Sequence, residues 1–201
     1  AGEGISVAVF YKHFKNPIEW NYVDAGGSYQ FSFENARSAR NYGVEIDLRK
    51  SLAFIGMNNF MLTLNAAWIE SKVLFGEQSR EHDRPMQGQS PYLVNAGLFY
   101  QNGRIGFAAG ILYNRIGKRI VGIGRVSMYE MPRNSLDLTV GQRLCKWLEA
   151  KAAARDLLGD AVRFMQFPRF RDSEGVVHER SQTTKRYYPG RSFSLSLTAT
   201  F

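Results

Sequence analysis

The last ten residues of the chain alternate without exception between apolar and polar side chains. The apolar row begins and ends on phenylalanine, with members at Phe193, Leu195, Leu197, Ala199 and Phe201. Only serine and threonine lie between them. A period of two predicts a strand with one apolar and one polar face. A strand in a soluble sandwich would present some lysine or glutamate to bulk water, and this one does not. The segment therefore predicts a strand of a transmembrane β-barrel, whose outer face meets lipid and whose inner face meets water.

The same alternation recurs along the rest of the chain. It predicts strands at about 5–15, 31–50, 59–71, 91–101, 105–115, 134–144 and 148–158, followed by the terminal strand at 191–201. The segment 148–158 has the weakest pattern, because Ala150, Ala152 and Ala154 also fit a helix, and its neighbours favour a strand. We therefore expect one all-β unit, a transmembrane antiparallel barrel of about eight strands, over residues 1–201.

The connections between these strands alternate between short and long. The segments 51–58, 102–104 and 145–147 are short, and Asn102-Gly103 is a strong hairpin signal because both turn positions need positive φ. The long segments are 16–30, 72–90, 116–133 and 159–189. This order is typical of an up-and-down barrel with short periplasmic turns and long external loops.

Aromatic residues recur eight positions apart on the apolar face of three strands. Eight residues span about 26 Å of strand, and a tilted strand of that length brackets an apolar band of about 25 Å. The spacing predicts two lipid-facing aromatic girdles. Their expected members are Phe60, Trp68, Tyr92, Tyr100, Tyr113, Phe193 and Phe201.

Composition excludes some classes and leaves others open. No uninterrupted apolar run approaches the ~18 residues of a membrane helix. The single cysteine, Cys145, excludes an internal disulfide framework. The net charge of +8 is spread over most segments, so it does not indicate a nucleic-acid surface by itself. The segment Ala1-Gly-Glu-Gly lacks the features of a signal peptide, so we expect a mature chain or, preferably, a piece of a longer one.

No set of residues indicates catalysis. His13, His82 and His178 lie in different segments without the spacing of a metal site. We therefore expect no enzyme activity, no metal and no cofactor. The charged segment 80–84 is expected to be a solvated loop, and the alternating charges at Glu45, Asp47, Arg49 and Asp137 are expected to form a hydrogen-bond network in the lumen.

The long segment 159–189 interleaves arginine with aromatic residues and is the expected ligand-binding surface. Its candidate residues are Arg163, Phe167, Arg169, Phe170, Arg171 and Arg180. Such a surface can bind sugars, anionic siderophores or nucleic acid, or the phosphates of lipopolysaccharide on the outer leaflet.

Several motifs resemble those of TonB-dependent outer-membrane receptors. Tyr187-Tyr188-Pro189-Gly190-Arg191 before a strand that ends in phenylalanine resembles the C-terminal strand of the family. The segment 41–45, Asn-Tyr-Gly-Val-Glu, resembles its recurrent G-x-E strand, and Arg155-Asp156-Leu157-Leu158 lies where such receptors often carry an Asn-Leu-Phe-like segment. Residues 85–95 resemble the entry to a late barrel strand, particularly in receptors of Bacteroidetes.

The resemblance implies the C-terminal third of a 22-stranded barrel that takes up a scarce nutrient such as an iron chelate, vitamin, glycan or peptide. It implies a plug domain, which this chain lacks, and TonB as partners in the parent protein. Barrel assembly machinery that reads Phe201, outer-membrane lipid, lipopolysaccharide and a surface lipoprotein are further expected partners, in the outer membrane of a Gram-negative bacterium.

Two alternatives remain open from the sequence. A complete eight-stranded barrel with a structural or adhesive role fits the strand count. A soluble basic β-protein that binds nucleic acid fits the charge and the aromatic content but not the strand faces, so we expect no nucleic-acid partner. The segment 31–50 favours the larger barrel, because it is long for a small barrel whose strands need ~9–11 residues. Small residues on the polar face also favour it, because a plug could pack against them: Gly97, Gly106, Ala108, Gly110 and Gly141.

Overall fold

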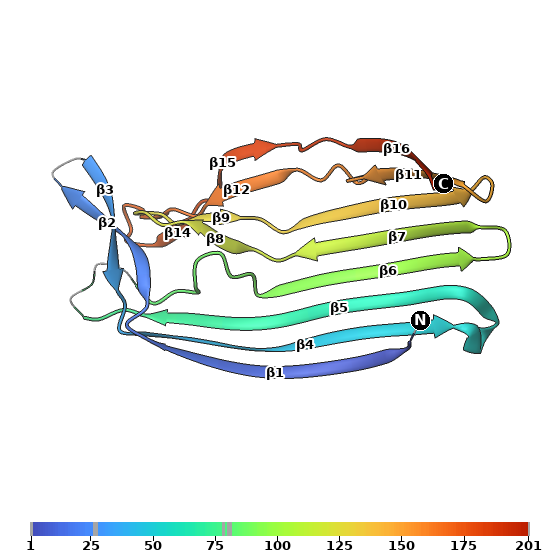
Figure 1. Cartoon of the computed structure of the whole chain (residues 1–201). Helices are drawn as coiled ribbons and strands as arrows, with labels where there is room; N and C mark the ends of the chain where they lie inside the picture. Colours follow the sequence, from blue (N-terminus) through green and yellow to red (C-terminus); the bar gives the residue numbers. More distant parts are fainter. Residues whose placement is uncertain (1, 26–27, 78, 80–81, 201) are drawn as a thin grey trace.

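Eight antiparallel strands form one curved sheet in the computed structural model, which describes residues 2–25, 28–77, 79 and 82–200 (Figure 1). In chain order and in sheet order the strands are β1 (Gly4–Lys15), β4 (Ser38–Leu52), β5 (Met57–Leu74), β6 (Tyr92–Asn102), β7 (Phe107–Ile116), β10 (Arg133–Arg143), β11 (Leu148–Arg155) and β16 (Ser192–Ala199). Every pair of neighbours is antiparallel. The predicted antiparallel all-β fold is confirmed, and the alanine-rich segment after residue 148 is a strand.

The expected strand at 31–50 is wrong in its first part. Residues there belong to two strands, β3 (Ser28–Asn35) and β4, and β3 pairs with β2 (Ile18–Ala25) in a separate hairpin. The hairpin closes where the backbone N–H of Ala36 donates to the carbonyl of Pro17 at 2.9 Å. Ala36 and Ala39 are then buried with Val73 and Phe75 in a small core. This core bends the chain between β3 and β4, so the membrane-facing part of the segment begins at β4.

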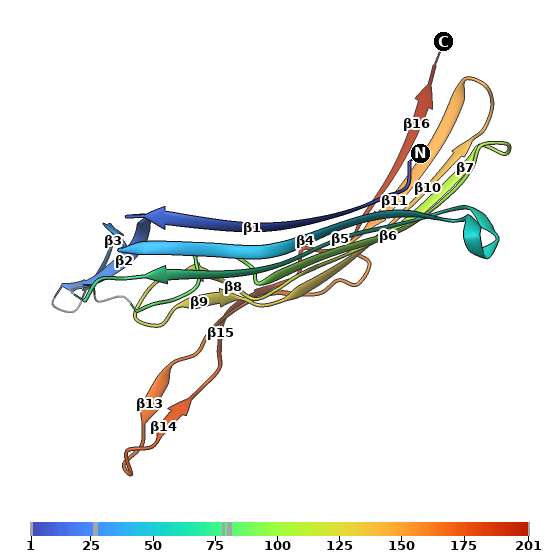
Figure 2. The ribbon, with the colours of Figure 1, turned by 90° about the horizontal axis from the view of Figure 1, so that it is seen from below.

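Short connections lie at one end of the sheet and long ones at the other (Figure 1). The short end carries the turns after β6 and β10 and a 3-10 turn, η1 (Ala53–Ile55). At the long end, β8 (Arg119–Gly122), β9 (Met128–Glu130), β12 (Val162–Gln166) and β15 (Gln182–Tyr187) form a second sheet in the order β15-β12-β9-β8. The hairpin of β13 (Arg169–Arg171) and β14 (Val177–Glu179) projects away from both sheets (Figure 2).

Strand register aligns the apolar faces of all eight strands. Residues directly opposite in an antiparallel ladder share a face. One row near the middle of the sheet runs through Leu62, Leu98, Ile111 and Leu138 on four successive strands. Val7 and Ile46 continue the apolar face toward β1, and Ala152 and Leu195 continue it toward β16. The sheet therefore has one apolar face, which we call the outer face, and one polar face, which we call the inner face.

The two edge strands, β1 and β16, lie at opposite ends of the sheet order. Their apolar side chains are strongly exposed, as in Val9 at 79% and Leu195 at 74%. Within the described residues, β1 pairs with β4 alone and β16 with β11 alone. The sheet is thus open, and its shape is that of part of a barrel wall.

Two aromatic rings cover glycines on the inner face. Phe10 lies directly opposite Gly43, and Phe99 lies opposite Gly110. A Cβ added at Gly43 would lie 2.3 Å from the backbone oxygen of Trp68, and one at Gly110 would lie 2.7 Å from the Phe99 ring. A ring laid over a strand glycine compensates for the missing side chain. The glycine of the G-x-E motif is therefore explained by close packing.

The Gly43→Ala substitution is expected to destabilise the sheet by about 1–3 kcal/mol, because a backbone atom must move to accept the added methyl. Gly4→Ala is the matched control on the neighbouring strand, since nothing lies within 4 Å of a Cβ at that position. Urea unfolding of the vesicle-inserted protein gives the difference. Equal stabilities of the two variants would contradict the close packing of β4 against β5.

Candidate functional site

A hollow lies at the long-loop end, between the β2–β3 hairpin and the β8–β9 connection. Its volume is about 750 Å³. Aromatic side chains from the hairpin and aliphatic ones from the connection line most of it: Trp20, Tyr22, Phe31, Val121, Ile123, Val126 and Met128. The remaining lining residues are Gln87, Gly122, Gly124, Arg125 and Gln166. We call this hollow the mouth cavity.

Backbone-directed hydrogen bonds hold the walls of the mouth cavity together. The side-chain amide of Gln87 donates to the carbonyl of Val121 at 3.2 Å, and that of Gln166 donates to the carbonyl of Val126 at 2.7 Å. The N–H of Gly88 donates to the carbonyl of Ile120 at 2.7 Å. Three separate long connections therefore meet at the cavity, and its shape is set by contacts that no single segment contains.

A buried ion pair ties the β2–β3 hairpin to the rest of the loops. The guanidinium of Arg84 lies 3.2 Å from the carboxylate of Glu19, with side-chain exposures of 8% and 9%. Arg84 also donates to the carbonyl of Trp20 at 3.3 Å and lies over the Phe75 ring at 5.1 Å. The expectation of a solvated loop at 80–84 is wrong for Arg84, which this pairing allows to be buried. Residues 80–81 lie outside the described part of the chain.

The lining defines the kind of ligand surface that fits. Its side chains are mainly aromatic and aliphatic, its one charged residue is Arg125, and no acidic residue is among them. Apolar pockets with a few polar groups favour ligands with an apolar body and a fixed polar handle. The mouth cavity suits an aromatic or aliphatic ligand surface that carries a neutral or negative group.

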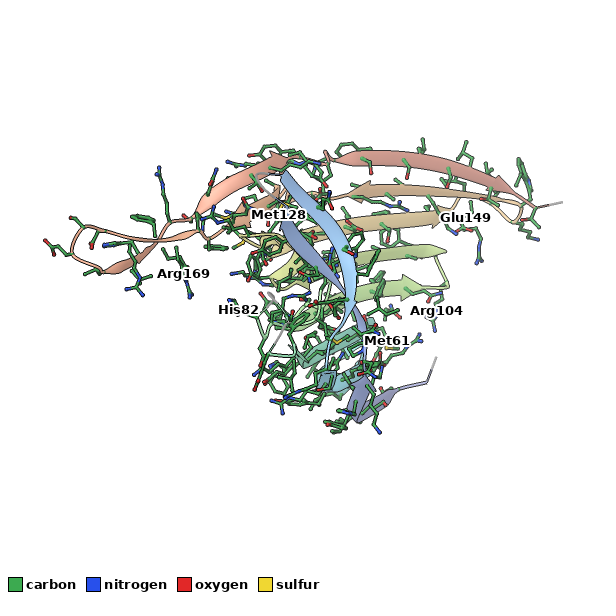
Figure 3. All side chains as sticks on the ribbon, turned by 90° about the vertical axis from the view of Figure 1, so that its left-hand side faces the viewer. Met61, His82, Arg104, Met128, Glu149 and Arg169 are labelled. Atoms are coloured by element: carbon green, nitrogen blue, oxygen red, sulfur yellow. The ribbon has the colours of Figure 1, made fainter. Side chains whose placement is uncertain are left out.

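The predicted ligand residues of segment 159–189 do not gather in one place. Arg163 lies in β12, and the Phe167 ring packs edge-on against Tyr129 at 5.7 Å. The others, Arg169, Phe170, Arg171 and Arg180, lie in or beside the projecting β13–β14 hairpin. Figure 3, which looks onto the long-loop end, shows Arg169 well to one side of Met128 of the mouth cavity.

Charges within the projecting hairpin partly satisfy one another. Arg169 lies 3.0 Å from the carboxylate of Glu179, and His178 lies 2.6 Å from that of Asp172. The hydrogen bond from His178, followed by that from the backbone of Val176, lowers the pKa of Asp172 below its ordinary value. Beside the mouth cavity, Lys72 and then the backbone of Phe75 lower the pKa of Asp83.

Sequence reasoning missed the residues of the mouth cavity. Trp20, Tyr22 and Phe31 fall in segments that were interpreted as a loop and as part of a long strand. Alternation of aromatic residues at Phe31 and Phe33 was the available signal, and it indicates the β2–β3 hairpin only once the break at Ala36 is known. The aliphatic residues of 121–126 carry no periodic signal.

The expected girdle residues share the outer face by register, and their contact with lipid stays a prediction. Phe60 is opposite Tyr100 with ring centroids 4.9 Å apart, and Trp68 is opposite Tyr92. Tyr113 and Phe193 share that face by register, and Phe201 lies outside the described residues. Phe107 was not predicted. It lies 5.9 Å from the Tyr100 ring, in the girdle nearer the short turns, which we call the lower girdle.

A row of amides crosses the inner face at one height. Asn65 of β5 donates to Asp47 of β4 at 3.5 Å, Asn95 of β6 donates to Asn65 at 3.4 Å, and Asn114 of β7 donates to Asn95. We call this row the amide strip. Asp47 was a predicted member of a lumen network, whereas the three asparagines were not. At this height the inner face is polar through three neutral amides and one carboxylate, and the predicted charged residues Glu45, Arg49 and Asp137 lie on the same face by register.

Neither a metal site nor a membrane-length helix is found in the part of the chain that the structure describes. No group of three or more His, Cys, Asp or Glu side chains in those ranges is placed to hold a metal ion. Within the same residues, no helix has the length and apolar character needed to cross a membrane.

A sheet of antiparallel neighbours with an apolar outer face, a polar inner face, short turns at one end and long loops at the other is the wall of an outer-membrane type β-barrel. The chain belongs to the TonB dependent receptor-like, beta-barrel family, whose model matches residues 1–146. This is a family of receptors and transporters of the Gram-negative outer membrane and not of enzymes.

A solved receptor shares the fold. The chain is similar to a mutant ferric enterobactin receptor from Pseudomonas aeruginosa, in complex with enterobactin, with a TM-score of 0.60 and 19% identity. The match covers 100% of this chain and 29% of the receptor chain. No curated protein sequence matches the chain.

Proposed function

We propose that the chain forms part of the barrel wall of a TonB-dependent receptor, in the outer membrane of a Gram-negative bacterium, that takes up a scarce nutrient. The observation that carries the proposal is the outer face, which stays apolar in register across all eight strands while the inner face stays polar. The share of the solved receptor that the chain matches, 29%, supports a place in the C-terminal third of a 22-stranded barrel.

The mouth cavity is the proposed outer contact for the nutrient. Iron chelates, vitamins, glycans and peptides all remain candidates, and the aromatic lining favours members of these classes with aromatic or aliphatic surface. The arginines and aromatic rings of 163–180 are a second proposed contact, and those of the projecting β13–β14 hairpin, Arg169, Phe170 and Arg171, would approach a ligand from the side.

Partners follow from the same proposal. A plug domain would lie against the inner face, and TonB would couple the receptor to the inner membrane. Barrel assembly machinery would read the terminal strand that ends in Phe201, and a surface lipoprotein would cover the long-loop end.

The complete small barrel is the competing proposal. It requires β1 to pair with β16, since an unpaired edge is costly in lipid. In the described residues these strands are the two opposite edges of the sheet. No specific observation therefore favours the small barrel.

The Trp20→Ala substitution in the full-length receptor tests the role of the mouth cavity. Trp20 is 41% exposed in the cavity wall, and loss of its ring as a contact for the ligand is expected to lower ligand binding by about tenfold or more. Uptake and binding are measured for a panel of labelled ferric chelates, cobalamin, oligosaccharides and peptides in cells that lack their own copy. Phe54→Ala is the control, an exposed aromatic at 70% on the short-turn end. If Trp20→Ala takes up every transported compound as the parent does, the cavity is not the contact site.

A further inference from the structure

Positively charged side chains lie on the outer face just beyond the girdle nearer the long loops, which we call the upper girdle. Arg115 follows Tyr113 by two residues on β7 and so lies on the same face, one step nearer the long-loop end. Its guanidinium donates to the hydroxyl of Tyr92 at 3.2 Å and to the side-chain oxygen of Asn134 at 2.8 Å. The girdle tyrosines therefore hold an arginine at the height where apolar surface ends.

A hollow of about 540 Å³ adjoins this arginine. Its lining residues are Asn134, Leu158, Gly159, Asp160, Ala161, Arg163, Arg186 and Tyr188. Asn134 lies on the outer face, directly opposite Arg115. The hollow thus opens on the same side of the sheet as the girdle, and not toward the inner face or the mouth cavity.

Two arginines face each other inside the hollow. Arg163 of β12 and Arg186 of β15 are direct partners in the antiparallel ladder, and both are exposed. Like charges directly opposite in a sheet repel each other unless an anion lies between them. The guanidinium of Arg186 donates a hydrogen bond to the hydroxyl of Tyr188 and lies over the Tyr188 ring at 5.2 Å. This arrangement holds two guanidinium groups toward one point.

The single carboxylate of the hollow is already engaged. Asp160 accepts hydrogen bonds from the backbone N–H of Asn134 at 3.1 Å and from its side-chain amide at 2.9 Å. The first of these lowers the pKa of Asp160, and the charge of Arg163 contributes less. Asp160 offsets part of the positive charge, and the two facing arginines leave an excess.

We propose that this hollow binds a phosphate group on the headgroup of an outer-leaflet lipid, with Arg163 and Arg186 as its ligands and Arg115 beside them. The proposal rests on the proposed placement in an outer membrane, because that placement sets the outer face against lipid. Phosphate is the matching anion, since planar guanidinium groups bind its oxygens in pairs. Girdle aromatics mark the interface at which such headgroups lie.

A second row of basic side chains on the outer face lies at the long-loop end of other strands. His13, Arg40 and Lys72 are direct neighbours on β1, β4 and β5. They lie on the same face as Tyr11 and Tyr42, beyond the girdle in the same direction. The proposed lipid contact therefore lies at the same level as other basic side chains of the outer face. Among these basic residues, Arg163 and Arg186 face each other and line one hollow.

The test compares the full-length receptor with the double variant R163Q/R186Q. Both are purified in mild detergent, and bound lipopolysaccharide is titrated and counted by native mass spectrometry. Loss of the charge-assisted hydrogen bonds is expected to weaken binding by about tenfold or more. Chemically dephosphorylated lipopolysaccharide is expected to bind both proteins equally weakly. R169Q/R171Q is the matched control, since it removes the same charge from the projecting hairpin and is expected to bind like the parent.

Three further measurements distinguish a lipid phosphate from free phosphate, and a failure of the site from a failure of the proposed function. Inorganic phosphate at equal concentration is expected not to displace the lipid, and displacement would overturn the lipid assignment in favour of a free-anion site. Unchanged binding in R163Q/R186Q would overturn the site itself. Heat-modifiable gel mobility confirms that each variant is folded. Absence of the parent receptor from isolated outer membranes would instead contradict the proposed function, on which the inference rests.

Discussion

The Ile111→Arg substitution is expected to destabilise the membrane-inserted receptor by about 2–4 kcal/mol, whereas Leu112→Arg is expected to cost much less. The two residues are neighbours on β7, are similar in size, and are exposed to similar extents of 46% and 40%. They lie on opposite faces. Ile111 lies in the central apolar row between Leu98 and Leu138, and Leu112 lies opposite Asp137 on the inner face.

The physical reason is the absence of water on one side only. An arginine in the middle of the apolar band must lose its hydration or distort the bilayer. On the inner face it meets water and the carboxylate of Asp137. The measurement is the folding free energy into phospholipid vesicles, from urea titrations followed by tryptophan fluorescence. Comparable losses in the two variants would show that the apolar face does not contact lipid.

The Glu19→Ala substitution is expected to release the β2–β3 hairpin. It removes the carboxylate that lies 3.2 Å from the buried guanidinium of Arg84, and breaking a buried ion pair on one side costs about 3–5 kcal/mol. The backbone amides of 18–22 and 30–35 are then expected to exchange with deuterium at least about a hundredfold faster. The strands of the main sheet should keep their protection, because none of them depends on Glu19.

Two further variants decide whether burial is the cause. Glu19→Leu combined with Arg84→Met replaces both charges with apolar side chains and is expected to restore most of the protection. Arg169→Ala breaks an exposed pair, with side-chain exposures of 73% and 48%, and should change local stability by less than about 1 kcal/mol. If the exposed pair matters as much as the buried one, the hairpin is held by some other contact.

The pattern of the strands was sufficient to predict the main sheet. Leu136, Leu138 and Val140 alternate with polar residues in the same way as Phe193, Leu195 and Leu197, and one face of each strand can be assigned from that alternation. The alternation of short and long connections then predicts the antiparallel order, because a short connection leaves no room for a crossover. The positive φ expected at Asn102 and Gly103 is wrong, since the turn runs from the end of β6 at Asn102 to the start of β7 at Phe107 and its positive φ, 66°, is at Gly106. The apolar face of a strand and the direction of a short turn depend on residues close together in the sequence, so both can be predicted from one sequence.

The long-loop end depends on contacts between distant segments. Glu19 and Arg84 form a buried pair across 65 positions of the sequence, and no pattern within either segment indicates its partner. Arg163 meets Arg186 through a register that includes a bulge between Phe164 and Met165. Asn65, Asn95 and Asn114 align because two connections, β5–β6 and β6–β7, fix the heights of their strands. Such alignments are set by loop geometry, which alternation does not report.

The amide strip has a consequence for whatever body fills the lumen of the proposed receptor. Its asparagines donate and accept among themselves, so each finds a partner within the wall. When a neighbouring domain separates from such a wall, few hydrogen-bond donors of the wall lose a partner. Unsatisfied hydrogen bonds are the main free-energy cost of separating polar surfaces. A domain that fills the lumen can therefore separate from this part of the wall, let water reach it and bind again at a small cost in free energy. A transport cycle in which the lumen domain moves repeatedly requires this property.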